Sequence, residues 1–355
     1  MAYSPDSRPT DPSMMDSTTA DLPDENQDDT SVTVMSVIRL IFHYFGVYVS
    51  LAIICVGIVG NFLSIVVFIK RRKQDRASAQ YLGLLALVDF LNLSMIALHD
   101  WFHMNLHIVS QGRFSHDKYV ESDTGCKFLM SIWNVLSFLS SWIIICFSIE
   151  RCLVIWFPLK MAPIVSSAKP RKRALGILIS IAVVMYLPNI YRIALRSLTP
   201  GHPERLACAW RADISQVEIY VFLFQILVIA TALPCILVTV LNVLILVGIF
   251  HNRMDSIKSS TNADMRCVKN LLFVSSFYFI FMAPFSFTWS IYYIAEANDF
   301  HGFSAEAAKV LGEMAQYTTS LTYLNYAINP LLYTLSLDFY RAECKRLFCC
   351  MVEKI

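Results

Sequence analysis

Residues 133–159 read WNVLSFLSSWIIICFSIERCLVIWFPL. The stretch predicts one apolar helix, with Ser140 and Ser141 inside it and Glu150 and Arg151 near one end. A charged pair in so apolar a helix is costly in hydrocarbon, so we expect the pair to lie at a membrane interface and to have a function there. The stretch therefore predicts a membrane protein organised around this helix.

The composition points the same way. Of the 355 residues, 56% are hydrophobic and only 16% are charged, and the net charge of +2 gives no argument for a nucleic-acid partner. Lys and Arg gather in alternate gaps between the apolar runs. The positive-inside rule then places these gaps in the cytoplasm and the N-terminus outside. The basic gaps are 70–76, 160–173, 253–269 and 341–354.

Seven apolar runs reach the roughly 20 residues that a bilayer demands. Because lipid cannot satisfy backbone polar groups, each run predicts a helix. The count and the charge bias together predict an all-α membrane protein, a seven-transmembrane helix bundle occupying residues 46–335. The runs are 46–69, 81–102, 128–156, 175–192, 219–250, 271–294 and 310–335.

The two ends of the chain differ from the bundle. Residues 1–45 predict a disordered acidic extracellular tail, since their first part is polar and nearly devoid of large apolar residues. Residues 336–355 predict a short amphipathic eighth helix on the inner leaflet and a short tail. Cys349 and Cys350 in that segment are candidates for palmitoylation, with free or buried thiols as the alternative. No internal repeat or second domain is evident.

Polar residues inside the spans each need a reason to be there. One interpretation is a hydrogen-bond network that holds the helices together. The other is a cation site, because the buried carboxylate of Asp89 has no Lys or Arg partner in these runs and would prefer a proton or Na⁺. The residues concerned are Asn61, Asp89, Ser140, Asn325 and Asn329.

Several motifs resemble those of class A (rhodopsin-like) G-protein-coupled receptors, and the overall pattern resembles an invertebrate-type neuropeptide receptor. No single motif is specific, but their joint order and spacing are, and the resemblance covers nearly the whole chain. It implies a receptor and not an enzyme. The motifs are Gly60-Asn61, Leu85–Asp89, Glu150-Arg151-Cys152, Asn329–Tyr333 and the kink prolines Pro188, Pro234 and Pro284.

The resemblance also implies roles for single residues. Cys126 and Cys208, the two cysteines in predicted outer segments, would form a disulfide. Arg151 would bind Asp264 in the resting state, and releasing that pair would open a cleft for a heterotrimeric G protein or arrestin. The alternative is that Arg151 only reaches lipid phosphates. The remaining implied roles are Leu159 as an apolar contact to the G protein, Asn329, Pro330 and Tyr333 as part of the activation switch, and Pro284 with Met282, where the family usually carries Trp, as a hinge.

The outer cavity decides the ligand. Trp133 stands where amine receptors of the family carry Asp, and Tyr323 stands where opsins carry Lys, so neither an amine nor retinal is expected. Aromatic and amide side chains suit an extracellular peptide, in which an Arg would pair with Asp100. The residues expected to face this cavity are His99, Asp100, Trp133, Asn134, Gln225, Phe285, Trp289, Tyr292, Gln316, Thr319 and Tyr323.

Other functions stay open at this stage. His99, His103 and His107 recur every four residues, which is metal-ligand spacing, so a Zn²⁺- or proton-sensing receptor is one alternative and ordinary interfacial histidines are another. A small-molecule receptor, a seven-helix transporter and a seven-helix hydrolase are further alternatives. Apart from a possible Na⁺, no cofactor is expected, and the localisation expected is the plasma membrane.

Overall fold

A computed structural model describes residues 37, 44–72, 77–99, 101–102, 122–197, 206–211, 213–255, 262–298 and 300–352. Within some of these ranges, among them 195–197, 206–210 and 262–272, only the backbone is described. The chain divides into two units, Met1–Phe42 and His43–Ile355, and the long helices that the structure describes belong to the second.

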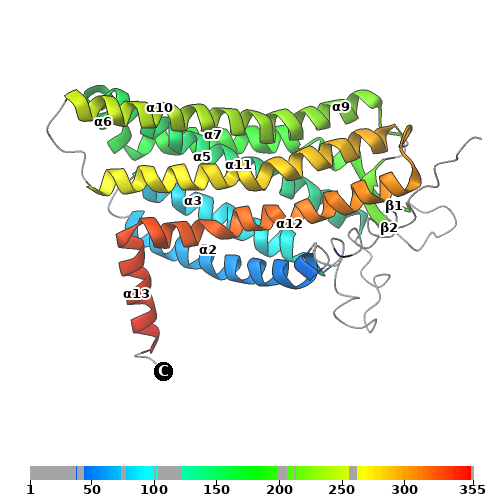
Figure 1. The fold of residues 1–355 in the computed structure, drawn as a ribbon, viewed down its shortest axis with the longest axis horizontal. Helices are drawn as coiled ribbons and strands as arrows, with labels where there is room; N and C mark the ends of the chain where they lie inside the picture. Colours follow the sequence, from blue (N-terminus) through cyan, green and yellow to red (C-terminus); the bar gives the residue numbers. More distant parts are fainter. Residues whose placement is uncertain are drawn as a thin grey trace, which may run out of the picture. The chain divides into compact units, whose positions relative to one another are not determined.

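Long helices lie side by side along one direction in the second unit (Figure 1). A hairpin of two strands lies at one end of these helices, called here the hairpin end. Helix α13 starts at the other end, called the α13 end, and runs roughly perpendicular to the long helices and away from them. The helices up to the hairpin are η1 (Phe45–Val49), α2 (Ser50–Arg72), α3 (Ala77–Leu91), η2 (Asn92–Ala97), α5 (Asp123–Trp156), α6 (Pro158–Ser166), α7 (Ala168–Tyr186) and α8 (Asn189–Arg192). After the strands β1 (Ile193–Ser197) and β2 (Leu206–Trp210) come α9 (Gln216–Phe224), η4 (Gln225–Ala232), α10 (Leu233–Asp255), α11 (Asn262–Ala297), α12 (Ala305–Ser336) and α13 (Asp338–Val352).

Six helical stretches of the described chain are long and apolar enough to cross a membrane. They are Phe45–Lys70, Ala79–Ala97, Asp123–Trp156, Ala168–Arg192, Gln216–His251 and Ser276–Glu296. Helix α12 has 32 residues but is more polar, because Glu306, Lys309 and Glu313 lie near its start and hydroxyl and amide side chains fill its middle. It packs against α2 and α11 and so supplies the seventh long helix of the bundle.

The surface of the bundle is apolar where a soluble protein would be polar. Val184 on α7 is 72% exposed, and Val56, Phe250, Phe287 and Leu335 on other helices are also largely exposed. So much exposed aliphatic and aromatic surface along the helices is stable against lipid and a liability in water. The exposed faces therefore mark the surface that contacts the membrane.

Helix α5 lies at the centre of the packing, since it contacts α3, α7, α10 and α11. The helix starts with Ser122 as its cap, whose Oγ accepts a 3.0 Å hydrogen bond from the backbone nitrogen of Gly125. Small residues also let α2 and α12 approach each other closely. A Cβ on Gly57 would lie 2.6 Å from the Cβ of Ala327, so glycine here lets α2 pack directly on α12.

Several features of the backbone differ from the expectations above. The fourth span is not one helix to Arg192, because α7 ends at Tyr186 and Pro188, which has no backbone N–H to donate, leads into the separate short helix α8. Leu159, expected to contact the G protein, lies at the start of helix α6 and is 94% exposed, and its role stays a prediction. The antiparallel pair β1–β2, with Leu195 opposite Cys208, adds strands to a chain expected to be all helical. The boundaries expected at residues 45 and 335 stay predictions.

Candidate functional site

A buried carboxylate joins three helices in the middle of the bundle. Asp89 on α3 is fully buried, and its Oδ1 accepts a 2.9 Å hydrogen bond from Ser140 Oγ on α5. Its Oδ2 accepts a 2.6 Å bond from Asn329 Nδ2 on α12. The structure therefore brings together three residues that lie far apart in sequence.

The two remaining members of the expected polar set lie on the neighbouring helices. Asn61 Nδ2 donates to the carbonyl oxygens of Gly57, at 3.0 Å, and Tyr326, at 2.9 Å, and so ties α2 to α12. Asn325 is buried in α12, 4% exposed. The hydrogen bonds described for Asp89 come from neutral groups. The oxygen atoms that could bind a cation such as Na⁺ here are those of the Asp89 carboxylate and the Ser140 hydroxyl.

A second polar group lies near the α13 end of α5. Glu150 is 9% exposed, and its Oε2 accepts a 3.0 Å hydrogen bond from Tyr81 Oη on α3. The same oxygen lies 3.3 Å from Arg171 Nε on α7, and Arg171 is 3% exposed. Glu150 is therefore held by the helices on either side of α5.

Aromatic rings continue this group toward Arg151. The guanidinium carbon of Arg171 lies 5.9 Å from the centre of the Tyr81 ring, which stacks on Phe147 at 5.4 Å. The guanidinium carbon of Arg151 lies 5.1 Å from the centre of the same Phe147 ring. Two cations thus lie against one stacked ring pair, which is a favourable cation–π arrangement. The side chain of Asp264 lies outside the described residues, so its pairing with Arg151 stays a prediction.

Tyr333 lies in an aromatic cluster beside the start of α13. It is fully buried, and its ring packs edge-on at 5.4 Å against Phe68 and at 5.8 Å against Tyr340. Tyr340 Oη and Ser64 Oγ share a 2.7 Å hydrogen bond, which fastens α13 to α2. Pro330 lies inside α12, which continues through it. The side chains of Cys349 and Cys350 lie outside the described part of the chain, so palmitoylation stays a prediction.

A cavity opens among the helices toward the hairpin end. It holds about 630 Å³ of space between side chains, part of it open to solvent, and every side chain described around it is uncharged. Its lining residues are Met130, Trp133, Asn134, Ser137, Tyr186, Phe222, Ile226, Ala230, Thr231, Met282, Phe285, Trp289, Tyr293, Thr322 and Tyr326. A concave site lined by aromatic side chains with a few polar groups is typical of ligand sites.

Aromatic rings form a connected wall of this cavity. Phe285 lies 6.2 Å from both Trp133 and Trp289, measured between ring centres, and Trp289 lies 5.2 Å from Tyr293. Trp289 Nε1 donates a 2.9 Å hydrogen bond to Thr319 Oγ1, which fixes the indole. The wall therefore presents flat apolar ring faces to the cavity, and the indole N–H of Trp289 is already hydrogen-bonded.

Four residues expected to face a ligand line this cavity: Trp133, Asn134, Phe285 and Trp289. Tyr292 and Thr319 do not line the cavity themselves but contact Trp289, which does. Asp100 lies outside the described residues. The remaining expected residues are not among the residues that line this cavity. Tyr323 packs with Trp101 and Leu93, Gln316 is exposed and His99 is half-buried. Gln225 accepts a hydrogen bond from Arg192 and donates one to the carbonyl of Met185.

Sequence reasoning missed most of the cavity floor. Met130, Asn134 and Ser137 recur at helical spacing on α5, so the assignment of Asn134 was a signal that its neighbours one turn away would share its face. Met282, expected as a hinge, also lines the cavity. Ser137 Oγ and Tyr326 Oη share a 3.1 Å hydrogen bond at the floor, one helical turn from Ser140 and Asn329.

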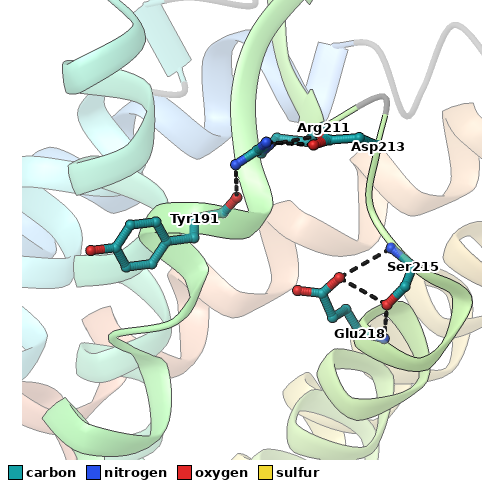
Figure 2. A network of polar contacts seen from close by, with 5 residues as sticks. All are labelled: Tyr191, Arg211, Asp213, Ser215 and Glu218. Atoms are coloured by element: carbon teal, nitrogen blue, oxygen red, sulfur yellow. Dashed lines mark hydrogen bonds and ion pairs between the residues drawn. The ribbon is translucent and has the colours of Figure 1, made fainter.

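The loop that follows β2 is fastened to the bundle by charged groups (Figure 2). Arg211 forms a bidentate pair with Asp213, with Nε at 2.9 Å and Nη2 at 2.5 Å, and donates through Nη1 to the carbonyl oxygen of Tyr191 at 3.4 Å. The hydrogen bond from Arg211 lowers the pKa of Asp213 below its ordinary value. Ser215 and Glu218 form a reciprocal capping box at the start of α9.

Cys126 lies fully buried in the first turn of α5 and is disulfide-bonded. The hairpin lies against α5, and β2 contains Cys208. The side chain of Cys208 lies outside the described residues, so its identity as the partner stays a prediction. Among the described residues no three His, Cys, Asp or Glu side chains form a metal site, and His103 and His107 fall outside them.

The described part of the chain forms seven long helices with lipid-facing apolar surfaces, a buried polar layer and a cavity open toward one end, an arrangement that fits a seven-helix membrane receptor. The model of the 7 transmembrane receptor (rhodopsin family) matches residues 60–333, and the chain belongs to this family. The predicted seven-helix bundle and the class A resemblance are thereby confirmed, and the protein is a receptor and not an enzyme.

Similar proteins include receptors named for different ligands. Human neuromedin-U receptor 2 is 25% identical over 81% of this chain and 67% of its own length. Mouse somatostatin receptor type 2 is 24% identical over 91% of this chain and 80% of its own length. A human purinoceptor is 23% identical over 86% of this chain and 79% of its own length.

Proposed function

We propose that this receptor binds an extracellular peptide at the hairpin end and activates a heterotrimeric G protein at the α13 end. In the plasma membrane the hairpin end would face outward and the C-terminus would lie in the cytoplasm. Arrestin would share the α13 end, Na⁺ would bind at Asp89, and membrane lipids would contact the exposed apolar faces. The N-terminus would lie outside.

The main support for a peptide ligand is that the described residues lining the cavity are uncharged and largely aromatic. Trp133, Phe285 and Trp289 present flat faces to aromatic or aliphatic side chains, and Asn134 and Ser137 supply hydrogen-bonding groups for peptide amides. A phosphorylated purine would require Lys or Arg in the cavity to bind its charge, and no described lining residue is charged. Of the ligands for which the similar receptors are named, peptides such as neuromedin-U and somatostatin therefore fit better.

Activation would begin with a change in the contacts between α5 and α11. Ligand groups entering between Trp133 on α5 and Phe285 on α11 would alter the packing of these two helices around Met282 and Pro284. Because Pro284 removes one backbone hydrogen bond inside α11, that helix can bend there without unfolding. Movement of its far end would expose Arg151 to the G protein.

A functional screen tests the ligand. Cells expressing the receptor are challenged with a library of amidated and free-acid neuropeptides and, in parallel, with purine nucleotides, while G-protein activation is recorded. We expect responses to one or more peptides and their loss in Arg151→Ala. Responses to nucleotides alone would overturn the peptide assignment, and full activation of the Arg151→Ala receptor would overturn the coupling mechanism.

Topology requires a separate test. Epitope tags on the two termini are probed with antibodies before and after the cells are permeabilised. We expect the N-terminal tag to be accessible on intact cells and the C-terminal tag only after permeabilisation. Tags accessible on the same side would contradict a seven-span arrangement of this orientation.

A further inference from the structure

A buried cation lies at the hairpin end, where α8 meets β1. Arg192 is the last residue of α8 and is only 8% exposed. Its backbone is fixed, since its carbonyl oxygen accepts a 3.0 Å hydrogen bond from the backbone nitrogen of Arg211. Its Nη1 donates to two amide oxygens, Asn189 Oδ1 at 3.1 Å and Gln225 Oε1 at 3.2 Å. The partners described for this guanidinium are therefore neutral.

The charge of Arg192 has no close counter-ion within the described part of the chain. None of the ion pairs there includes it. The acidic side chain that acts on it electrostatically is Glu218, but Glu218 Oε2 accepts hydrogen bonds from the nitrogen and Oγ of Ser215, at 3.1 and 2.8 Å (Figure 2). A buried cation without a close counter-ion is unfavourable, so the position favours an anion supplied by another molecule.

The groups around Arg192 also offer more hydrogen-bond donors than acceptors. Asn189 is fully buried, and its Nδ2 has no partner among the described residues, while its Oδ1 is taken by Arg192. Because Nη1 makes the two side-chain bonds described for Arg192, Nε and Nη2 remain as the pair of donors that a carboxylate binds in bidentate form. Arg211 binds Asp213 through the same two atoms in this receptor. The donors that remain therefore match a carboxylate.

This cluster lies behind one wall of the cavity. Gln225, which binds Arg192, follows Phe222 by three residues and directly precedes Ile226, and both of these neighbours line the cavity. Gln225 Nε2 also donates to the backbone of α7 at the residue before Tyr186, which lines the cavity as well. The Tyr186 hydroxyl is buried without a partner in the described structure, so this wall holds a further donor.

We propose that Arg192 is an anion subsite beside the aromatic cavity, and that it binds a carboxylate of the peptide, either the C-terminus or an Asp or Glu side chain. The inference rests on the proposed function and deepens it, because it names the chemistry of the ligand at the same site. Aromatic groups of the peptide would contact the wall while Arg192 holds one acidic end. A single guanidinium with neutral neighbours matches the one charge of a carboxylate better than the several charges of a di- or triphosphate.

Small probes that differ in one group test the inference before the peptide is known. N-acetyl-Phe-Trp is used with a free C-terminal carboxylate and as its neutral amide. N-acetyl-Asp-Trp-amide and N-acetyl-Asn-Trp-amide form the second pair, in which only the side chain differs in charge. Full-length receptor in lipid nanodiscs is melted at increasing concentrations of each probe, and the affinity follows from the rise in melting temperature.

We expect the wild type to bind the acid of at least one pair about tenfold more tightly than its neutral match, the scale of one charge-assisted hydrogen bond. The pair that shows this preference identifies the source of the carboxylate. Arg192→Gln should abolish the preference, and Arg192→Lys, which keeps the charge but loses the fork, should retain part of it. Arg211→Gln is the matched control, because that cation already pairs with Asp213, and it should retain the full preference. A purely structural role of Arg192 would not change the ratio between two matched probes.

A second variant moves the counter-ion into the protein. Asn189→Asp keeps the oxygen that Arg192 binds and replaces the unpartnered Nδ2 with another oxygen. It should raise the melting temperature of the receptor without a probe and abolish the preference for the acid. This variant decides the question if Arg192→Gln does not fold.

The following results would overturn the inference: a wild type that binds none of the four probes or binds acid and neutral probes equally, or a preference that persists in Arg192→Gln or Asn189→Asp. ATP that stabilises the wild type more than either acid, and loses this effect in Arg192→Gln, would replace the carboxylate with a phosphate and overturn it too. The proposed function fails separately. A preference that depends on Arg192, in a receptor that no peptide of the functional screen activates, supports the carboxylate subsite and overturns the proposed function.

Discussion

Asn329 Nδ2 donates a 2.6 Å hydrogen bond to Asp89 Oδ2, which joins α12 to α3 across 240 positions of the sequence. Ser140 holds the other oxygen of the same carboxylate. The polar centre of the receptor is therefore a single carboxylate shared by three helices. Its charge state and its ion occupancy should affect all three helices together.

The first prediction concerns Na⁺ at this carboxylate. We expect the melting temperature of the purified receptor to rise with NaCl and not with choline chloride at the same ionic strength, since only Na⁺ is small enough for the oxygen ligands around Asp89. Asp89→Asn keeps the side-chain shape and removes the charge, so the Na⁺ effect should disappear. An equal rise in both salts would show that Na⁺ does not bind there.

The second prediction tests the aromatic wall. Phe285 faces the cavity and is 9% exposed, whereas Phe287, two residues along the same helix, is 67% exposed on the outer surface. Phe285→Ala should weaken ligand potency about tenfold or more, the usual effect of removing a central aromatic contact. Phe287→Ala is the matched control and should leave potency unchanged. Equal effects of the two variants would place the ligand elsewhere.

A third prediction contrasts two buried amides. Both amide atoms of Asn92 are buried and have no hydrogen-bond partner in the described part of the structure, whereas Asn61 donates to two carbonyl groups. Replacing an unsatisfied polar side chain with an apolar one of similar size removes a burial cost of about 1–3 kcal/mol. Asn92→Leu should therefore raise the melting temperature and Asn61→Leu should lower it. A fall for Asn92→Leu would mean that an internal water satisfies this amide.

The fourth prediction concerns pH at the outer loop. Because Arg211 holds the pKa of Asp213 below its ordinary value of 3.8, the stability this pair adds is complete above that value and is lost only as the pH falls through the lower folded pKa. Signalling measured between pH 5 and 8 should therefore not depend on Asp213. Asp213→Asn should leave the pH profile of the response unchanged in shape. A profile that flattens in this variant would contradict the assignment and would make Asp213 part of a proton sensor.

The helices themselves could be predicted from the sequence more fully than the contacts between them. The apolar runs and the charge bias predicted the helices, because bilayer thickness and backbone hydrogen bonding leave few alternatives. The meeting of Asp89, Ser140 and Asn329 was expected as a network, since buried polar groups need partners. The helix prediction rests on a constraint that acts on one helix at a time, and the network prediction rests on the need of each buried polar group for a partner.

Contacts that depend on helix rotation could not be predicted in the same way. Gln225 was expected to face the outer cavity, and its side chain bonds to Arg192 and to the carbonyl of Met185. The type of an amide side chain does not indicate which neighbour it faces, so these contacts could not be predicted. The role of Gln225 in ligand binding stays a prediction. The ion pair between Arg171 and Glu150 was also missed, because Arg171 lies in a basic run that looked like a solvated inner loop. The hairpin was missed because its strands are only five residues each and lack a long alternating pattern.

The last prediction concerns how closely α5 and α10 pack at the α13 end. Trp156 Nε1 donates a 3.0 Å hydrogen bond to the carbonyl oxygen of Leu244, and a Cβ added to Gly248 would lie 2.7 Å from Ile155 Cγ2 and 3.0 Å from Trp156 Nε1. Gly248→Ala should therefore push α10 away from α5 and cost about 1–3 kcal/mol, as overpacking does.

Gly176 provides the opposite case on α7, since a Cβ there would meet nothing within 4 Å. Gly176→Ala should stabilise the receptor by about 0.5–1 kcal/mol, because alanine restricts the unfolded chain and glycine weakens a helix interior. Melting temperatures of the two variants in identical nanodiscs should thus move in opposite directions. If Gly248→Ala is as stable as Gly176→Ala, α5 and α10 have room to separate at this end, and the Trp156 contact does not hold them together.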